Sequence, residues 1–147
     1  MCNGRIMIAG TNSGCGKTTV VCGLLKCLLN RKMNIHAFKC GPDYIDTSFH
    51  KKVLKIPTGN LDSWFCKPED LRKIVSKKAD KCDIAVIEGV MGYYDGMGFT
   101  QRASAYEIAD ITSTPVILII NCKGMSSSLE AVLSGFVNMK QNSHIKG

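Results

Sequence analysis

A ten-residue stretch near the N-terminus carries the residue types of a phosphate-binding loop. It reads Gly-Thr-Asn-Ser-Gly-Cys-Gly-Lys-Thr-Thr over residues 10–19, between a short apolar run at 6–9 and an amphipathic run that begins near Lys17. Strand, glycine-rich loop and helix in this order are the context that a P-loop requires. The backbone N–H groups of such a loop form, with the helix N-terminus, a concave anion site. We therefore expect this stretch to bind the phosphates of a nucleotide; the alternative is a chance glycine-rich turn before Lys-Thr-Thr.

Two residues of the loop have distinct expected roles. Lys17 is expected to reach the β- and γ-phosphates and to act in catalysis, and the Thr18 hydroxyl is expected to hold a magnesium ion. The strict pattern has glycine at position 11, but Thr11 stands there and the glycine is Gly10. The residues expected to contact the nucleotide are Thr11, Asn12, Ser13, Gly14, Cys15, Gly16, Lys17, Thr18 and Thr19.

Glu88 directly follows the apolar run 84–87, which is expected to be a buried strand. This is the Walker-B position, where a carboxylate holds the magnesium of the nucleotide. We expect Glu88 to take that role; the alternative is a surface acid at the end of a strand.

Three aspartates lie in loops after the expected strands 35–38 and 84–87. Asp43 and Asp46 come after the strand at 35–38, and their spacing would place both on one face of a helical turn. Asp46 or Thr47 could equally cap the helix that follows. Asp95 stands in the Gly-Tyr-Tyr-Asp-Gly segment and could equally be a turn residue, because Asp-Gly favours turns.

Apolar periodicity and turn residues predict the elements that position these side chains. Helices are expected at 17–31, 47–54, 68–79, 103–111 and 127–139, strands at 6–9, 35–38, 84–87 and 116–120, a turn at 59–62 and a glycine-rich loop at 89–98. Strands that alternate with helices predict an α/β fold, a P-loop NTPase three-layer sandwich with a mainly parallel sheet. Residues 1–147 are about one domain in length, and we expect a further strand to begin at 145–147, so that the domain is truncated before its last strands.

Composition narrows the class of protein. No apolar run approaches the roughly 18 residues of a membrane span, and the N-terminus does not resemble a signal peptide. The eight cysteines include no C-x-x-C pair, which favours a reducing cytoplasm over disulfides or zinc. The net charge of +7 indicates an anionic partner, either a nucleotide or a carboxylate-rich substrate, unless a missing acidic region balances it. Aromatic residues make up only 7% of the chain, which gives no support for nucleic-acid binding.

Four blocks of the sequence resemble the cobyrinic acid a,c-diamide synthase family, which includes the hydrogenobyrinate and nickel-sirohydrochlorin a,c-diamide synthases. They are the phosphate loop, Phe-Lys-Cys-Gly-Pro-Asp-Tyr-Ile-Asp at 38–46, Asn-Leu-Asp at 60–62 and Glu-Gly-Val-Met-Gly-Tyr-Tyr-Asp-Gly at 88–96. The related cobyric acid synthases carry a different block after the second strand. Residues 103–106 read Ala-Ser-Ala-Tyr, where the family tends to Gly-Ser-Thr-Ala. More distantly, the loop resembles that of dethiobiotin synthetase.

The resemblance implies an ATP-dependent ligase that amidates the a and c acetates of a corrinoid or related tetrapyrrole through an acyl phosphate. Ammonia would come from glutamine through a glutaminase domain in cis, and a homodimer is compatible with the resemblance. The implied site residues are Lys17, Asp43, Asp46 and Asp95 for catalysis, Lys39 for the nucleotide, Thr18, Asp43 and Glu88 for magnesium, and Tyr44, Ile45, Asp46 and Asp95 for the substrate.

Other functions share these patterns. Switch ATPases of the partitioning or membrane-targeting type have the same fold, but they carry a second lysine where this chain has Asn12, and no basic amphipathic helix for a membrane is evident. A dethiobiotin synthetase-like ligase and a simple nucleotide-binding module are further alternatives. The three histidines, His36, His50 and His144, have no obvious cysteine partner, so we expect no glutamine hydrolysis by this chain.

Overall fold

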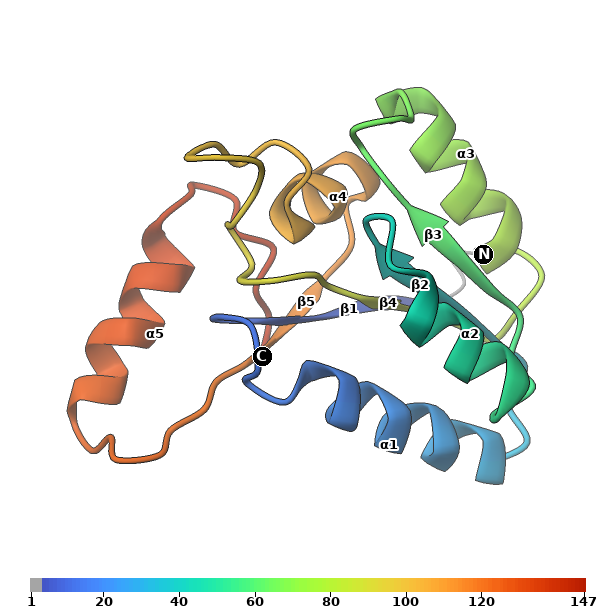
Figure 1. Ribbon diagram of the computed structural model, residues 1–147, viewed down its shortest axis with the longest axis horizontal. Coiled ribbons are helices and arrows are strands. Elements are labelled where there is room, and N and C mark those ends of the chain that lie inside the picture. Colours follow the sequence, from blue (N-terminus) through green and yellow to red (C-terminus); the bar gives the residue numbers. More distant parts are fainter. Residues whose placement is uncertain (1–3) are drawn as a thin grey trace.

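Five parallel strands form the centre of the molecule (Figure 1). In this computed structural model the description covers residues 4–147, apart from the side chains of residues 44–46. The strands are β1 (Gly4–Gly10), β2 (Ile35–Cys40), β3 (Thr58–Leu61), β4 (Ile84–Glu88) and β5 (Val116–Ile119), in the order β3-β2-β4-β1-β5. Every pair is parallel, so the carboxyl ends of all five strands meet at one edge, where ligands bind in doubly wound sheets.

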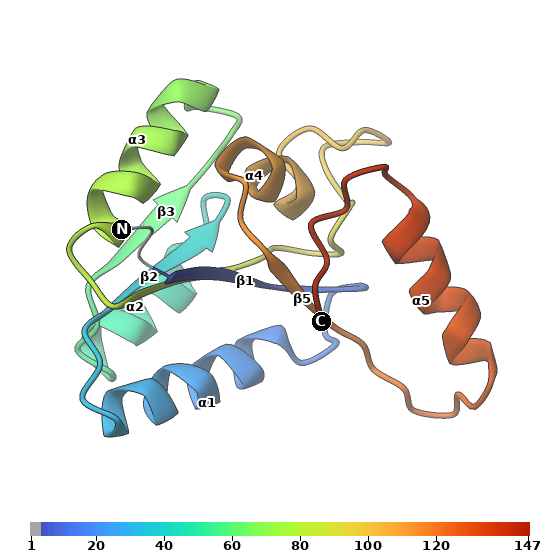
Figure 2. The ribbon, with the colours of Figure 1, turned by 180° about the vertical axis from the view of Figure 1, so that it is seen from behind.

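Helices cover both faces of the sheet. Figures 1 and 2 show α1 (Lys17–Asn30) and α2 (Tyr44–Lys52) on one face and α3 (Pro68–Ala79) and α4 (Ala105–Thr112) on the other. The last helix, α5 (Ser128–Asn138), lies to the side, beyond β5. This is the three-layer α/β sandwich that the alternation of strands and helices predicts.

The two cores follow from the alternation of side chains along the buried strands. Beneath α1, side chains from three strands pack against apolar helix residues, including Ile8, Ile35, Val86, Val21 and Leu25. On the other face the core includes Met7, Phe38, Ile87, Leu71, Val75 and Ile108. Because neighbouring strand residues point to opposite faces and both faces are covered, the strands are almost continuously apolar.

The expected helices and strands are confirmed, but the segment 59–62 differs from its prediction. Residues 59–61 belong to β3, which pairs with β2 along its whole length. Gly-Asn favours a turn locally, yet Leu61 is fully buried and a Cβ at Gly59 would lie 3.5 Å from the Phe38 ring. Sheet pairing and packing on Phe38 therefore override the local turn preference. The helix expected at 47–54 instead begins at Tyr44 and ends at Lys52.

Residues 145–147 lie along the outer side of β5. Ile145 forms a parallel bridge with Val116, and the Leu118 N–H donates to the Gly147 carbonyl oxygen at 2.8 Å. This contact is an isolated bridge and not an assigned strand, so the further strand expected at 145–147 stays a prediction. Among residues 4–147, no helix is both long and apolar enough to cross a membrane.

Candidate nucleotide-binding site

The loop between β1 and α1 has the backbone of a phosphate cradle. Gly14 and Gly16 adopt left-handed conformations with φ of 76° and 104°, which favour glycine. A Cβ at Gly10 would lie 2.3 Å from the Cys15 Sγ and 3.0 Å from the Lys17 Cγ. Gly10 is therefore required where it stands, because two side chains of the loop fold back onto it. A pocket of about 260 Å³ opens over Gly14, Gly16, Lys17, Thr18 and Thr19.

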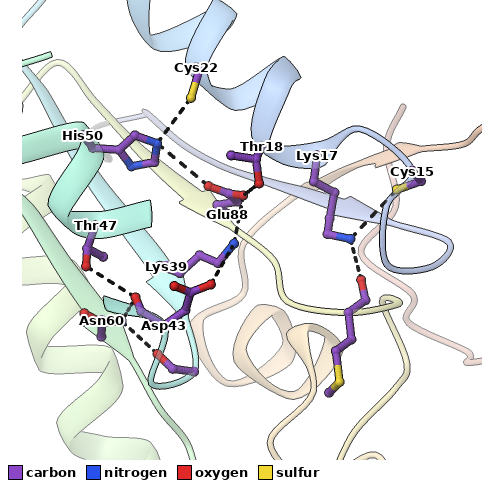
Figure 3. A network of polar contacts seen from close by, with 12 residues as sticks. Cys15, Lys17, Thr18, Cys22, Lys39, Asp43, Thr47, His50, Asn60 and Glu88 are labelled. Atoms are coloured by element: carbon purple, nitrogen blue, oxygen red, sulfur yellow. Dashed lines mark hydrogen bonds and ion pairs between the residues drawn. The ribbon is translucent and has the colours of Figure 1, made fainter. Parts of the chain in front are cut away.

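Lys17 is buried within the loop. Its Nζ donates to the carbonyl oxygen of Asn12 at 2.9 Å and to that of Met91 at 2.7 Å. It also lies 3.9 Å from the Cys15 Sγ (Figure 3). The ammonium group thus joins the phosphate loop to the loop that follows β4. A buried ammonium held by neutral carbonyls is a cation available to an anionic ligand.

Glu88 ends β4 and is fully buried. Its Oε1 accepts hydrogen bonds from the Thr18 hydroxyl at 2.6 Å and from the Lys39 Nζ at 2.9 Å (Figure 3). Lys39 is opposite Glu88 in the β2–β4 register and is also buried, so the two form an ion pair inside the sheet edge. The Oε2 is buried without a hydrogen-bond partner among the described residues, and the His50 Nε2 lies 4.0 Å from it.

These oxygens fit a magnesium ion. Magnesium takes hard oxygen ligands and is usually held by one or two carboxylates, with phosphates and water completing its shell. The Thr18 hydroxyl and the Oε2 of Glu88, which accepts no hydrogen bond from the described residues, supply oxygens of this kind beside the phosphate loop. Within the described part of the chain, no three His, Cys, Asp or Glu side chains form a cluster that could hold a metal ion by themselves.

The loop after β2 brings Asp43 to the same place. The Asp43 Oδ2 lies 3.9 Å from the Lys39 Nζ, and the side chain is 36% exposed. The Asn60 amide donates to the carbonyl oxygens of Gly41 and Asp43, both at 2.9 Å, and so fixes this loop against β3. The side chains of Tyr44, Ile45 and Asp46, which are expected to bind substrate or act in catalysis, lie outside the described residues.

Asp95 closes a turn within the loop 89–98. Its Oδ2 accepts the Gly92 N–H at 3.0 Å, and its own N–H donates to the Gly92 carbonyl oxygen. A Cβ at Gly92 would lie 2.8 Å from the Thr11 carbonyl oxygen, so this turn rests on the start of the phosphate loop. The structure places Asp95 in the turn that its Asp-Gly sequence favours and close to the phosphate site; its role in catalysis stays a prediction.

Buried tyrosines hold the loop 89–98 in position. The Tyr93 hydroxyl donates to the Ser143 carbonyl oxygen at 2.7 Å, and the Tyr94 hydroxyl donates to that of Phe136 at 2.8 Å. Burial raises the pKa of Tyr93 far above its usual range and raises the pKa of Tyr94 to about 12. Both phenols therefore remain neutral donors at physiological pH, and the backbone N–H of Tyr93 bonds to the Gly10 carbonyl oxygen.

One expectation about the histidines is wrong. The Cys22 Sγ on α1 lies 3.7 Å from the His50 Nε2 on α2, so His50 does have a cysteine neighbour (Figure 3). No motif in the sequence joins the two residues, but Cys22 shares a helix face with Thr18, four residues earlier. Both belong to helices and neither lies on a strand-to-helix turn, the usual place of an activated cysteine. Asn60 was also missed as a residue that orders the site, although it stands in one of the blocks that carry the family resemblance.

The phosphate cradle, its buried lysine and the carboxylate at the end of β4 define a P-loop nucleotide-binding protein of the α/β class. The chain belongs to the CobQ/CobB/MinD/ParA nucleotide binding domain family, which it matches over residues 6–146.

Individual relatives make the similarity more specific. The cobyrinate a,c-diamide synthase of Priestia megaterium is 40% identical over 148 residues, covering 100% of this chain and 32% of that protein. The enzymes of the same name from Limosilactobacillus reuteri (strain DSM 20016) and Salmonella typhimurium (strain LT2) are 43% and 42% identical, covering 97% and 96% of this chain. The chain spans about a third of the length of these relatives.

Solved structures support the fold alone. The signal recognition particle receptor FtsY from Elizabethkingia anophelis superposes with a TM-score of 0.67 at 12% identity, covering 95% of this chain and 48% of that one. The BceF tyrosine kinase domain superposes with a TM-score of 0.60 at 10% identity, covering 88% and 62%.

Proposed function

We propose that this chain is the ATP-binding part of a ligase that amidates the a and c acetate carboxylates of a corrinoid or related tetrapyrrole. The observation that carries the proposal is the identity of about 40% with cobyrinate a,c-diamide synthases along essentially the whole chain. The geometry supports it, because the phosphate loop, Asp43, Glu88 and the loop of Asp95 converge on one edge of the sheet.

The chemistry explains why ATP is needed. A carboxylate resists ammonia because its leaving group would be oxide. In the proposed reaction a substrate carboxylate oxygen attacks the γ-phosphorus, the bond to the β–γ bridging oxygen breaks, and ADP leaves. The nitrogen of ammonia then attacks the acyl carbon, the bond from that carbon to the phosphate oxygen breaks, and inorganic phosphate leaves as one proton passes to solvent.

Residues of the phosphate loop would stabilise the first step. The Lys17 Nζ would exchange its two carbonyl acceptors for phosphate oxygens and neutralise the charge that spreads over the transferring group. The loop N–H groups, held by Gly14 and Gly16, would orient the phosphates. Two anions, the carboxylate and the triphosphate, could then approach each other without strong repulsion.

Thr18 and Glu88 would hold magnesium, with Asp43 beside them, and the bound ion would supply further positive charge to the phosphates. Lys39 would orient Glu88, since its buried Nζ donates a hydrogen bond to the Oε1 at 2.9 Å. Asp43, Asp46 and Asp95 would lie on the substrate side of the phosphates. Ammonia would come from glutamine through a separate glutaminase unit.

The test is direct. The protein is incubated with cobyrinate, ATP, magnesium and an ammonium salt, and products are followed by mass spectrometry together with phosphate release. We expect two successive amidations, each with the release of one phosphate. Phosphate release that is independent of the tetrapyrrole, with no amide formed, would instead indicate an ATPase of the switch type.

A further inference from the structure

A second pocket, distinct from the phosphate cradle, lies at the same edge of the sheet. We call it the Trp64 pocket; it has a volume of about 300 Å³, and its lining includes Gly41, Pro42, Trp64, Phe65, Met91 and Met97. These residues follow β2, β3 and β4, so the pocket lies beyond the carboxyl ends of three adjacent strands. That is where parallel α/β sheets bind ligands.

The lining exposes apolar surface that the fold does not need to expose. Phe65 is 78% exposed, and Trp64, Met91 and Met97 are each at least 40% exposed. Large apolar side chains that gather around one concave site mark a binding surface, because water disfavours such a cluster. The chemistry of this wall suits a flat, apolar ligand.

The pocket is also built to hold a fixed shape. The Ser63 hydroxyl donates to the Glu107 carboxylate, and the same carboxylate accepts the Ala103 N–H at 2.7 Å. The Trp64 N–H donates to the Asp62 Oδ1 at 2.9 Å. The loop that carries Trp64 is thereby tied to the start of α4, on the far side of the pocket. A rigid wall loses little entropy when a ligand binds.

A cation stands beside the apolar wall. The Arg102 Cζ lies 4.4 Å from the centroid of the Trp64 ring, so the guanidinium stacks on the indole. Stacking uses the flat face of a guanidinium, so the N–H groups at its edge can still form paired hydrogen bonds with a carboxylate. The guanidinium thus stands next to a flat apolar face; the lining also includes the Asp62 carboxylate, which accepts the Trp64 N–H.

Met91 joins this pocket to the phosphate site. Its side chain lines the Trp64 pocket, while its carbonyl oxygen accepts the Lys17 Nζ at 2.7 Å. Lys17 is the residue expected at the β- and γ-phosphates, so a ligand in the pocket lies beside the transferring end of the triphosphate. In ATP the nucleobase is joined through the ribose to the α-phosphate, so it would lie at the opposite end of the nucleotide from Lys17.

We propose that the Trp64 pocket binds one edge of a carboxylated tetrapyrrole, with Trp64 and Met97 against the macrocycle and Arg102 on a peripheral carboxylate. The inference rests on the proposed function and adds where and how the substrate is held. The volume of about 300 Å³ is at the small end of ligand pockets, so the pocket holds an edge of the macrocycle and leaves its remainder outside.

Steady-state kinetics on substitution variants test this. Trp64→Ala and Arg102→Gln should each raise the KM for cobyrinate by about tenfold, as expected for the loss of one stacking contact or one charged hydrogen bond. The KM for ATP should stay within about twofold, since neither residue lines the phosphate cradle. Trp64→Phe should restore most of the cobyrinate affinity, because it keeps an aromatic face.

Two control variants remove equivalent groups elsewhere. Met139→Ala removes an exposed apolar side chain at the end of α5, and Arg31→Gln removes a cation at the other end of α1, away from the phosphate loop. Both should leave every kinetic constant unchanged. Trp64 is the only tryptophan in the chain, so its emission gives a second readout: cobyrinate should quench it and magnesium-ATP alone should not.

Three outcomes would overturn the inference. If amidation proceeds in Trp64→Ala and Arg102→Gln with an unchanged KM for cobyrinate, the substrate binds elsewhere and the proposed function stands. If those variants raise the KM for ATP, and ATP alone quenches Trp64, the pocket holds the nucleobase. If the wild-type protein neither binds nor amidates cobyrinate, the proposed function itself fails and the inference fails with it.

Discussion

At the scale of a single residue, Lys17 shows how the phosphate loop is arranged to bind an anion. Its ammonium is buried and shared between the carbonyl oxygens of Asn12 and Met91. Neutral acceptors satisfy the hydrogen-bonding capacity of a buried cation but not its charge. Phosphate oxygens would satisfy both, so the side chain needs little movement to bind them.

Lys17→Ala should therefore lower ATP-dependent activity by about a hundredfold or more, because it removes a preorganised charge from the transferring phosphate. The matched control is Lys26→Ala, which removes an exposed lysine from the same helix and should have no effect. The measurement is phosphate release at saturating substrate. Activity of Lys17→Ala within a few-fold of wild type would remove the P-loop from the mechanism.

The buried pair of Lys39 and Glu88 would couple the proposed magnesium site to folding. Both side chains are out of contact with water and 2.9 Å apart. Removing one member of such a pair leaves an uncompensated buried charge, whereas replacing both is often tolerated. The sequence indicated a carboxylate at the end of β4, but the pairing of Lys39 with it depends on the β2–β4 register, which follows from the assembled sheet.

Glu88→Gln should thus weaken the magnesium dependence of activity and also lower the free energy of unfolding, by about 3–5 kcal/mol. The double variant Lys39→Met with Glu88→Gln should regain much of the stability but not the magnesium response. Asp43→Asn, at a partly exposed position, should cost less than about 1 kcal/mol. Chemical denaturation and a magnesium titration measure the two effects. A drop in stability with an unchanged titration would make Glu88 a structural residue.

At the scale of elements, the sequence predicts a helix or strand where local pattern and burial agree, and fails where contacts with neighbouring elements decide the conformation. The helix at 68–79 and the strand at 84–88 were predictable because periodicity and burial agree there. β3 was not predictable from local preference, since Gly-Asn favours a turn and only the neighbouring β2 makes it a strand. The contact of Cys22 with His50 likewise depends on how α1 and α2 meet, which no local pattern contains.

Ala103, at the turn into α4, has a strained backbone conformation whose effect on stability can be tested. It precedes the Ser104 N-cap of α4 and has φ of 63°, a left-handed conformation that favours glycine. The family to which the sequence shows resemblance tends to glycine here, which agrees with this backbone. The turn into α4 therefore carries an alanine in a conformation that costs roughly 1 kcal/mol.

Ala103→Gly should raise the free energy of unfolding by about 0.5–1 kcal/mol and the Tm by about 2–4 °C, after allowance for the greater entropy of the unfolded chain. Ala131→Gly, in the exposed interior of α5, is the matched control and should lower stability by about 1 kcal/mol. Thermal unfolding measures both. A loss of stability in Ala103→Gly equal to that of the control would contradict the strain at this turn.

At the scale of the whole molecule, the parallel sheet gathers residues that are distant in sequence. Lys17 follows β1, Lys39 is on β2, Asp43 follows β2 and Glu88 ends β4; they meet because the strands all run in one direction. The order of the strands could not be predicted from the sequence. The apolar runs before these four residues nevertheless predicted that each of them follows or ends a strand. The contact between Cys22 on α1 and His50 on α2 is not part of the pocket over the phosphate loop, although the His50 Nε2 lies 4.0 Å from the Glu88 Oε2.

This arrangement predicts the nitrogen source that the 147-residue chain can use. It should form amide with added ammonium salt and should release no glutamate from glutamine, because Cys22 and His50 do not form the strained turn of an activated nucleophile. The assay measures glutamate and phosphate together, with and without ammonium. Glutamate formed by the purified chain would show that it carries its own glutaminase site; Cys22→Ser would then reveal whether this pair is responsible.

The most direct test of the central proposal follows the oxygen of the substrate carboxylate. Cobyrinate labelled with oxygen-18 in its acetate carboxylates is amidated with ATP, magnesium and ammonium, and the inorganic phosphate is analysed by mass spectrometry. If the carboxylate is phosphorylated at the Lys17 site, each phosphate released on amidation carries one oxygen-18 atom. Amide formed with unlabelled phosphate would contradict the acyl-phosphate route.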